Sequence, residues 1–112
     1  QLNEKIRETL SKSELAERAI QYMKQHYQED ISLGDIAGAL YTAPAYLAKR
    51  FKEKKNSTVM QYLETIRINR AKELLEDSGL SVTEIAQEVG YGDPNYFTRS
   101  FKKICEWNGY RK

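Results

Sequence analysis

The feature that most constrains the fold of this chain is an internal repeat. The segment ISLGDIAGALYTAPAYLAKRFK at residues 31–52 aligns with LSVTEIAQEVGYGDPNYFTRSFK at residues 80–102. An offset of 49 aligns the first halves, and after one extra residue in the second copy an offset of 50 aligns a proline, a tyrosine, a phenylalanine and a lysine. One motif that occurs twice in 112 residues predicts two small units of similar structure.

Each copy has the pattern of a helix, a turn and a second helix. Ser81 is followed three residues later by Glu84, a pair that can satisfy free backbone N–H groups where a helix starts. We expect Gly90 and Gly92 to supply backbone angles with positive φ in the turn. Pro94 fits the first turn of the second helix, where its missing N–H does no harm. The sequence therefore predicts an all-α fold built from two helix-turn-helix units.

The same signals predict the helix starts elsewhere in the repeat. Ser32 and Asp35 match the capping pair of the second copy. Asp93 can cap the helix that begins at Pro94, and Thr42 is the expected cap of the corresponding helix in the first copy.

The second helix of each copy combines apolar anchors with polar residues. In the second copy, Phe97 and Phe101 are four residues apart and can face the core with help from Tyr96 or Ile104. The outward side then carries donors suited to base edges and phosphates, namely Asn95, Thr98, Arg99 and Lys102. In the first copy the expected anchors are Tyr46, Leu47 and Phe51, and the outward residues are Ala45, Ala48, Lys49 and Lys52.

Positive charge is concentrated in two short segments. Residues 42–56 and residues 94–112 each carry a net charge of +4, whereas the whole chain carries only +2, so the rest is acidic. Two basic segments on an acidic body suggest two contact patches for a polyanion. An ordinary solvated charged face is the alternative interpretation of this pattern.

Residues 57–79 between the copies predict a long helix. Ser57 or Thr58 can cap its start, and Gly79 fits a left-handed stop after its end. Its apolar residues recur with a period of about 3.6: Val59, Leu63, Ile66, Ala71, Leu74 and Leu75. A helix of about 20 residues is roughly 30 Å long, close to the roughly 34 Å between successive major grooves on one side of a duplex. We therefore expect a spacer between two recognition helices, with a plain core helix of a bundle as the alternative.

Upstream of the repeat, residues 11–27 predict the first core helix. Ser11 and Glu14 form a possible capping box. The expected inner face consists of Leu15, Ala16, Ala19, Ile20, Met23 and Tyr27. The spacing of Leu2, Ile6 and Leu10 suggests a helical stub from an upstream domain, or an ordinary fraying helix. Because the chain begins with Gln1, we expect it to be part of a longer protein.

Patterns of catalysis, metal binding and membrane insertion are weak in this sequence. The single histidine, His26, has no cysteine or carboxylate cluster at ligand spacing, and no phosphate-binding loop or nucleophile elbow is present. We therefore expect no enzyme activity, no metal and no cofactor. No apolar run approaches the roughly 18 residues of a membrane span, and no signal peptide appears. A lone Cys105, expected as a small semi-buried apolar residue, fits a reducing cytoplasm.

Residues 35–104 resemble the DNA-binding domain of AraC/XylS-type bacterial transcription regulators. The segment IAQEVGYGDPNYFTRSFKK is the most specific part, RINRAKELL supports it, and the likeness extends over about residues 13–104. The resemblance implies a homeodomain-like, seven-helix domain whose two recognition helices enter adjacent major grooves. It also implies boundaries, which we place at 1–12 for the stub, 13–56 for the first unit, 57–79 for the linker helix and 80–112 for the second unit.

The resemblance also implies partners. Such proteins usually activate transcription, so double-stranded DNA and RNA polymerase are the expected partners. The segments ISLGDIA and YLETIRINRAKELL are similar to output domains of two-component response regulators, which implies an upstream receiver or other regulatory domain and a possible dimer through it. Sugar-sensing relatives are an alternative origin.

The site residues implied by the family can be placed by number. The expected base contacts are Ala45, Ala48 and Lys49 in the first recognition helix and Asn95, Thr98 and Arg99 in the second. Arg99 is expected at a guanine, Asn95 at an adenine or a phosphate, and the two alanines at thymine methyl groups. The expected DNA backbone contacts are Thr42, Lys52, Asp93, Lys102 and Lys103. For each cation a solvated surface charge is the alternative.

Two departures from the family pattern affect these expectations. The tail ICEWNGYRK lacks the usual glycine and proline, with Glu106 at the glycine position, so the sequence does not carry the pattern of the last short family helix. The alternative role for this tail is that Trp107 or Tyr110 covers the core edge. Asn56 replaces a usual glycine acceptably, because asparagine tolerates the left-handed conformation. The alanine-rich first recognition helix supports one competing function, a helical protein-interaction module that has lost DNA binding.

Overall fold

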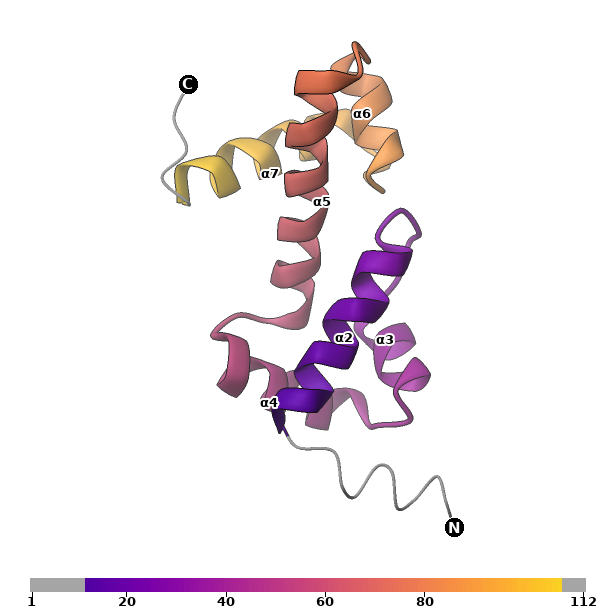
Figure 1. Cartoon of the computed structure of the whole chain (residues 1–112), viewed down its shortest axis with the longest axis vertical. Helices are drawn as coiled ribbons and strands as arrows, with labels where there is room; N and C mark the ends of the chain where they lie inside the picture. Colours follow the sequence, from indigo (N-terminus) through magenta and orange to yellow (C-terminus); the bar gives the residue numbers. More distant parts are fainter. Residues whose placement is uncertain (1–11, 108–112) are drawn as a thin grey trace. The chain divides into compact units, whose positions relative to one another are not determined.

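A computed structural model of the chain describes residues 12–107, and within that range it contains six helices and no strand (Figure 1). They are α2 (Lys12–His26), α3 (Leu33–Ala39), α4 (Pro44–Lys55), α5 (Val59–Asp77), α6 (Val82–Glu88) and α7 (Pro94–Trp107). The all-α prediction is confirmed, as is the helix-turn-helix order of both copies. The predicted stub, the cap at Ser11 and the tail beyond Trp107, with Tyr110, lie outside the described residues. Among the helices of residues 12–107, none combines the length and the apolar character that a membrane span requires.

The described helices form two compact units. The first consists of residues 12–26 and 31–63, and the second of residues 27–30 and 64–107. The long helix α5 contributes its start to the first unit and its remainder, from Glu64, to the second. Each repeat copy therefore has its own small core, to which α5 adds residues.

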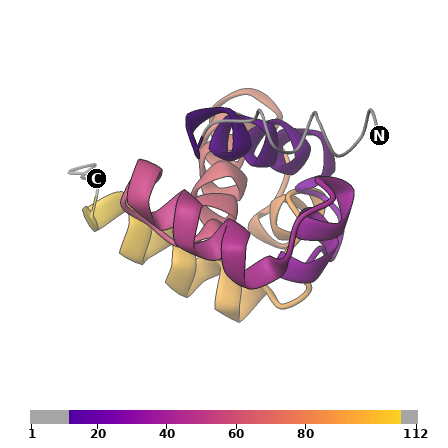
Figure 2. The same ribbon diagram turned by 90° about the horizontal axis from the view of Figure 1, so that it is seen from below.

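In the first unit, α2 packs against α3 and α4. Figure 2 shows α3 beside the N-terminal part of α4. The ring of Phe51 makes an edge contact with Tyr62, with centroids 5.5 Å apart. The buried residues include Leu15, Ala16, Ala19, Ile20, Met23, Ile36, Ala37, Leu47, Phe51, Val59 and Leu63. The predicted inner face of α2 is confirmed except for Tyr27, which follows the end of α2 and is half-buried in the second unit.

In the second unit, one cluster joins α5, α6 and α7. It contains Ile68, Ala71, Ile85, Ala86, Val89, Tyr91, Phe97 and Ile104, with Tyr27, Leu74 and Phe101 packed against it. The predicted anchors Phe97 and Phe101 are confirmed in this cluster. Leu75 was expected on the inner face of α5 but is 44% exposed, and the fully buried Ile68 takes a place that the predicted period did not include.

The capping pairs at the first helix of each copy are confirmed. Ser32 and Asp35 exchange hydrogen bonds with each other's backbone N–H groups at 2.9 and 3.1 Å, and Ser81 and Glu84 do the same at 2.9 and 3.2 Å. At the start of α7, Asp93 Oδ1 accepts from the Asn95 N–H at 3.0 Å, as predicted.

The predicted cap at Thr42 is wrong. The N-cap position of α4 is Ala43, which makes no side-chain hydrogen bond, and Pro44 is the first helical residue. Thr42 stands one residue too early, and its N–H instead donates to the Ala37 carbonyl at 3.0 Å, which closes the preceding turn. For α5, the two candidates resolve in favour of Thr58, whose Oγ1 accepts from the Gln61 N–H at 3.0 Å.

Positive φ angles occur at four described positions, and they correct one prediction. Gly90 has φ 97° and Gly79 has φ 75°, both as expected, and Asn56 ends α4 with φ 60°. Gly92 is not among these residues, so its predicted left-handed conformation is wrong. In the first copy, Tyr41 has φ 58° at the position that aligns with Gly90.

Candidate nucleic-acid interface

The helix α7 has one buried face and one exposed polar face. Phe97 and Ile104 are each only 2% exposed. Besides Tyr96, the exposed residues are polar: Asn95, Thr98, Arg99, Lys102 and Lys103. A helix with a polar, cationic outer face of this kind has the chemistry needed to contact base edges and phosphates. The candidate DNA contacts of the second copy therefore lie together on one accessible surface.

The side chains on this face differ in their freedom to bind DNA. The Thr98 hydroxyl donates to the Pro94 carbonyl at 3.0 Å, so its proton is already used and its methyl group and lone pairs remain available. The Arg99 guanidinium lies 5.9 Å from the centre of the Tyr96 ring. The Arg99 guanidinium carries its N–H donors in the planar arrangement that suits the O6 and N7 atoms of guanine.

In the first unit, the corresponding face of α4 is poorer in donors. Ala45 and Lys49 are exposed, as is Lys52, while Ala48 is half-buried. Ala48 therefore offers less surface than expected for a thymine methyl contact. Lys49 has the donor capacity among the three expected base contacts of this helix.

Tyr46 was expected as a core anchor of α4, and this prediction is wrong. Its side chain is 50% exposed, whereas Leu47 and Phe51 are fully buried. The Tyr46 ring lies instead beneath the guanidinium of Arg50, 5.2 Å from it, and Arg50 also forms an ion pair with Glu53 at 2.7 Å. Arg50, one turn further along α4, offers Tyr46 a cation–π contact at the surface in place of core burial.

The expected backbone-contacting residues surround the starts and outer faces of α4 and α7. The lysines Lys52, Lys102 and Lys103 are exposed, and Thr42 is half-buried. Asp93 is exposed, but its carboxylate accepts the capping hydrogen bond from Asn95. A carboxylate repels phosphate. Asp93 could therefore lie beside DNA only because the backbone N–H groups at the start of α7, which it helps to order, attract the phosphate.

A polar network in the second unit joins α5 to α7 and was missed by sequence reasoning. Glu64 Oε2 accepts from the buried Ser100 hydroxyl at 2.6 Å and lies 3.5 Å from the Tyr96 hydroxyl. Arg67 donates to the backbone oxygens of Tyr27 at 2.8 Å and Glu29 at 2.9 Å. These contacts fix the 27–30 segment and α7 to the linker helix.

Burial shifts the pKa values of Arg67 and of the neighbouring Tyr91. It lowers the pKa of the half-buried Arg67 guanidinium, and the two carbonyl acceptors satisfy part of its hydrogen-bonding capacity. Burial also raises the pKa of Tyr91 to about 12. Tyr91 therefore stays protonated near neutral pH and adds no charge beneath the exposed face of α7.

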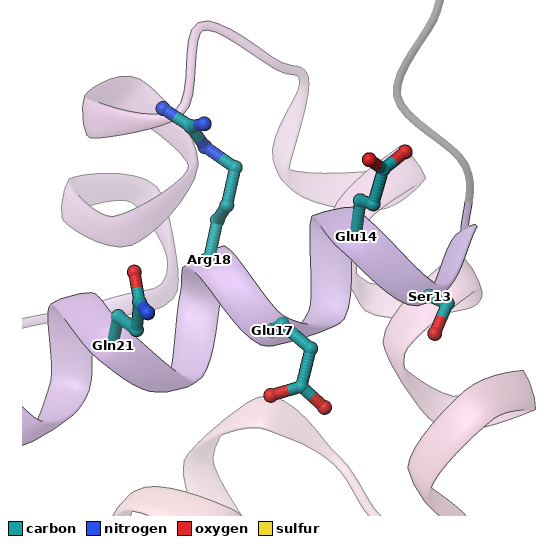
Figure 3. A pocket seen from close by; sticks show the side chains of 5 residues that line it. All are labelled: Ser13, Glu14, Glu17, Arg18 and Gln21. Carbon is teal, nitrogen blue, oxygen red and sulfur yellow. The ribbon is translucent and has the colours of Figure 1, made fainter.

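A shallow hollow on the surface of α2 has a different character. Figure 3 shows the side chains that line it, Ser13, Glu14, Glu17, Arg18 and Gln21. Glu17 forms an ion pair with Lys55 at 2.8 Å, and this partner lowers the pKa of the Glu17 carboxyl. Two carboxylates and one arginine make this hollow a poor surface for a polyanion. Across residues 12–107, no three His, Cys, Asp or Glu side chains gather in a group that could hold a metal ion.

Comparison with known proteins assigns the family. A model described as a helix-turn-helix domain matches residues 36–106, more than half of the chain. Among curated proteins, the HTH-type transcriptional activator RhaS of Klebsiella pneumoniae is 29% identical over 109 residues, which cover 88% of this chain and 39% of RhaS. The chain spans between 33% and 52% of the length of the first curated relatives it matches.

Solved structures support the same assignment. The C-terminal domain of AraT, a response regulator from Geobacillus stearothermophilus, is 34% identical with a TM-score of 0.80, over 88% of this chain and 80% of that one. The DNA-binding domain of the global transcriptional factor AdpA, solved in complex with a target DNA, is 29% identical with a TM-score of 0.74, over 80% and 79% of the two chains. With two helix-turn-helix copies, a matching family model and these relatives, the chain belongs to the AraC/XylS family of helix-turn-helix regulators.

Proposed function

We propose that this chain binds double-stranded DNA sequence-specifically through α4 and α7, placed in successive major grooves, and thereby regulates bacterial transcription. The observation that carries the proposal is the exposed row of Asn95, Thr98 and Arg99 over a buried apolar face, in a family whose member AdpA was solved with a target DNA. The test is selection of tightly bound duplexes from a random library. Two short recognised boxes about one helical turn apart support the proposal, and equal binding of all duplexes contradicts it.

The base-contacting roles follow from side-chain chemistry. Arg99 can donate two parallel hydrogen bonds to guanine, and Asn95 can pair with adenine. In α4, Lys49 supplies the hydrogen-bond donor and Ala45 offers a methyl contact to thymine. Ala48 can make the same kind of contact over a smaller area, because it is half-buried. We therefore expect the box bound by α7 to be the more strictly defined of the two.

The backbone roles follow from charge. The exposed lysines Lys52, Lys102 and Lys103 lie in the two basic segments and can neutralise phosphates without specifying sequence. Thr42 and the turn at Asp93 immediately precede the recognition helices and are proposed as further contacts to the DNA backbone, in which the Asp93 carboxylate caps the start of α7 instead of facing a phosphate. Binding through these groups should weaken steeply between roughly 50 and 200 mM salt. A protein-interaction module, which binds through apolar surface, should respond little to salt.

The remaining proposals concern the whole protein. We propose helix-turn-helix units at 13–56 and 80–112 joined by a linker at 57–79, in a cytoplasmic protein with an upstream regulatory or receiver domain through which it dimerises. The similarity to an activator, RhaS, and to a response-regulator domain, AraT, supports activation of transcription in contact with RNA polymerase. Fusion of the chain to a receiver domain, with transcription from a selected site as the readout, tests activation.

Replacing Arg99 with alanine should relax sequence preference at one base position. The loss of a bidentate contact should cost roughly 1–3 kcal/mol of discrimination there, measured as the ratio of dissociation constants for the selected duplex and its single-base variants. Arg18→Ala is the matched control, because Arg18 is an exposed arginine on α2 outside the proposed interface (Figure 3). If Arg99→Ala instead lowered the affinity for every duplex by the same factor, Arg99 would be a phosphate contact.

Replacing Lys102 with alanine should weaken binding to all duplexes by a similar factor. One fewer neutralised phosphate should also flatten the slope of log K against log salt concentration by about one unit. Fluorescence anisotropy at several salt concentrations measures both effects. Lys24→Ala, which removes an exposed cation from α2, should leave the slope unchanged. A wild-type slope in Lys102→Ala would place this lysine away from the DNA.

A further inference from the structure

The exposed tyrosine of α7 is tied to three other side chains. Although Tyr96 is 49% exposed, its ring makes an edge contact with the buried Tyr91 ring, with centroids 5.6 Å apart. Its hydroxyl lies 3.5 Å from Glu64 Oε2. Its ring in turn lies 5.9 Å from the guanidinium carbon of Arg99. Tyr96 therefore connects the core of the second unit to the arginine proposed to contact a base.

The carboxylate that contacts Tyr96 is itself held in place. Glu64 Oε2 accepts from Ser100 Oγ at 2.6 Å, a short hydrogen bond of the charge-assisted kind, and Ser100 is only 3% exposed. Glu64 of α5 therefore contacts Tyr96, three residues before Arg99, and Ser100, the residue directly after it. Glu64 and Tyr91 thus contact the Tyr96 side chain on its inner side, while about half of its surface stays open to solvent.

The first copy of the repeat lacks this arrangement. Tyr46 aligns with Tyr96, and Lys49 aligns with Arg99. The cation over the Tyr46 ring, however, is Arg50, which is also paired with Glu53 at 2.7 Å. In α7 the cation over the tyrosine ring is Arg99, the proposed base contact. In α4 the cation over the ring is Arg50, which is ion-paired and is not the proposed base contact.

We propose that Tyr96 is a positioning residue that holds the Arg99 guanidinium for base contact, with Glu64 and Tyr91 fixing the ring. The proposal rests on the DNA-binding function proposed above and deepens it. An arginine side chain has many rotamers, and ordering it on binding costs free energy unless it is ordered beforehand. A guanidinium over an aromatic face is attracted to it and keeps its edge donors free for a planar partner.

The experiment compares three variants of the full chain on a duplex selected from a random library and on its single-base variants. Tyr96→Leu removes the ring, whereas Tyr96→Phe keeps the ring and removes only the hydroxyl that faces Glu64. Tyr46→Leu is the matched control, because it removes the equivalent exposed ring of α4. Thermal melting of each variant checks that the fold is kept.

We expect Tyr96→Leu to reduce discrimination about two- to tenfold at the base position that Arg99→Ala identifies, with non-specific binding unchanged. Tyr96→Phe should restore most of that discrimination, and Tyr46→Leu should not alter it. In an Arg99→Ala background the effect of Tyr96→Leu should vanish, because the two residues act as one unit. A general packing role for Tyr96 would instead lower melting temperature and all affinities together.

Wild-type discrimination in Tyr96→Leu would overturn the positioning role while leaving the proposed function intact. A wild-type chain that binds all duplexes equally would instead end the proposed function. A readout without DNA separates the two cases further. Nitrogen-15 relaxation at Arg99 Nε should show a more mobile side chain in Tyr96→Leu than in the wild type or Tyr96→Phe, and equal mobility would contradict the proposal.

Discussion

Replacing Ile85 with aspartate is expected to unfold the second unit. Ile85 is fully buried in the cluster formed by α5, α6 and α7. An aspartate there would either bury an unpaired charge or pull α6 out of the core, and it would also lose the packing of the isoleucine. We expect a loss of about 4 kcal/mol or more in the free energy of unfolding. Urea unfolding followed by far-ultraviolet circular dichroism measures it.

The control for this change lies on the same short helix. Val82 is the first residue of α6 and is 48% exposed. Val82→Asp introduces the same charge at a solvated helix start, where a carboxylate is favoured by the helix dipole, so the free energy of unfolding should change by no more than about 0.5 kcal/mol. A wild-type melting temperature for Ile85→Asp would refute the placement of Ile85 in the core.

Features set by neighbouring residues could be predicted from the sequence. The capping pairs at Ser32 and Ser81 depend on residues three apart, and the left-handed stops at Asn56 and Gly79 depend on the conformational freedom of one residue. Buried faces of α2 and α6 followed from the spacing of apolar residues. These signals are local, so the helix order and most of the core could be predicted without coordinates.

The wrong predictions arose where two local solutions compete. Tyr46 has a ring large enough for the core, but a cation one turn away gives it a surface contact. Thr42 has a good capping side chain, but the turn needs its N–H and leaves Ala43 at the cap position. The conformation of a turn depends on how the two helices meet, which residue type alone does not determine.

Contacts between distant residues left no signal in the sequence. Glu64 meets Ser100 across 36 residues, and Arg67 meets the Tyr27 carbonyl across 40. The sequence does not show whether a charged residue of the linker helix is exposed to solvent or forms a hydrogen bond with a distant segment, because the residue type is the same in both cases. For the DNA contacts, the exposure of Asn95, Thr98 and Arg99 agrees with the expected outer face, whereas their roles depend on the chemistry of a DNA partner, which the sequence of this chain does not contain.

Replacing Gly90 with alanine is expected to destabilise the second unit for two separate reasons. Its φ of 97° is unfavourable for any residue with a Cβ. A Cβ at this position would also meet the Tyr27 backbone oxygen and lie 3.0 Å from Arg67 Nε. The substitution therefore strains the turn and disturbs the hydrogen bond between Arg67 and Tyr27. We expect a loss of about 2–4 kcal/mol in the free energy of unfolding, measured by urea titration.

Gly92 gives the matched control, because it lies two residues away in the same turn. Its φ is not positive, and a Cβ there meets no atom within 4 Å. Gly92→Ala should be neutral or should stabilise the chain by about 0.4–1 kcal/mol, because alanine reduces the conformational entropy of the unfolded state. Equal losses for the two variants would mean that the turn itself needs glycine at both positions, as the sequence pattern suggested. A loss confined to Gly90 would instead assign the requirement to the two features that Gly92 lacks, the positive φ and the close approach of the Tyr27 carbonyl, which belongs to a segment far away in the chain.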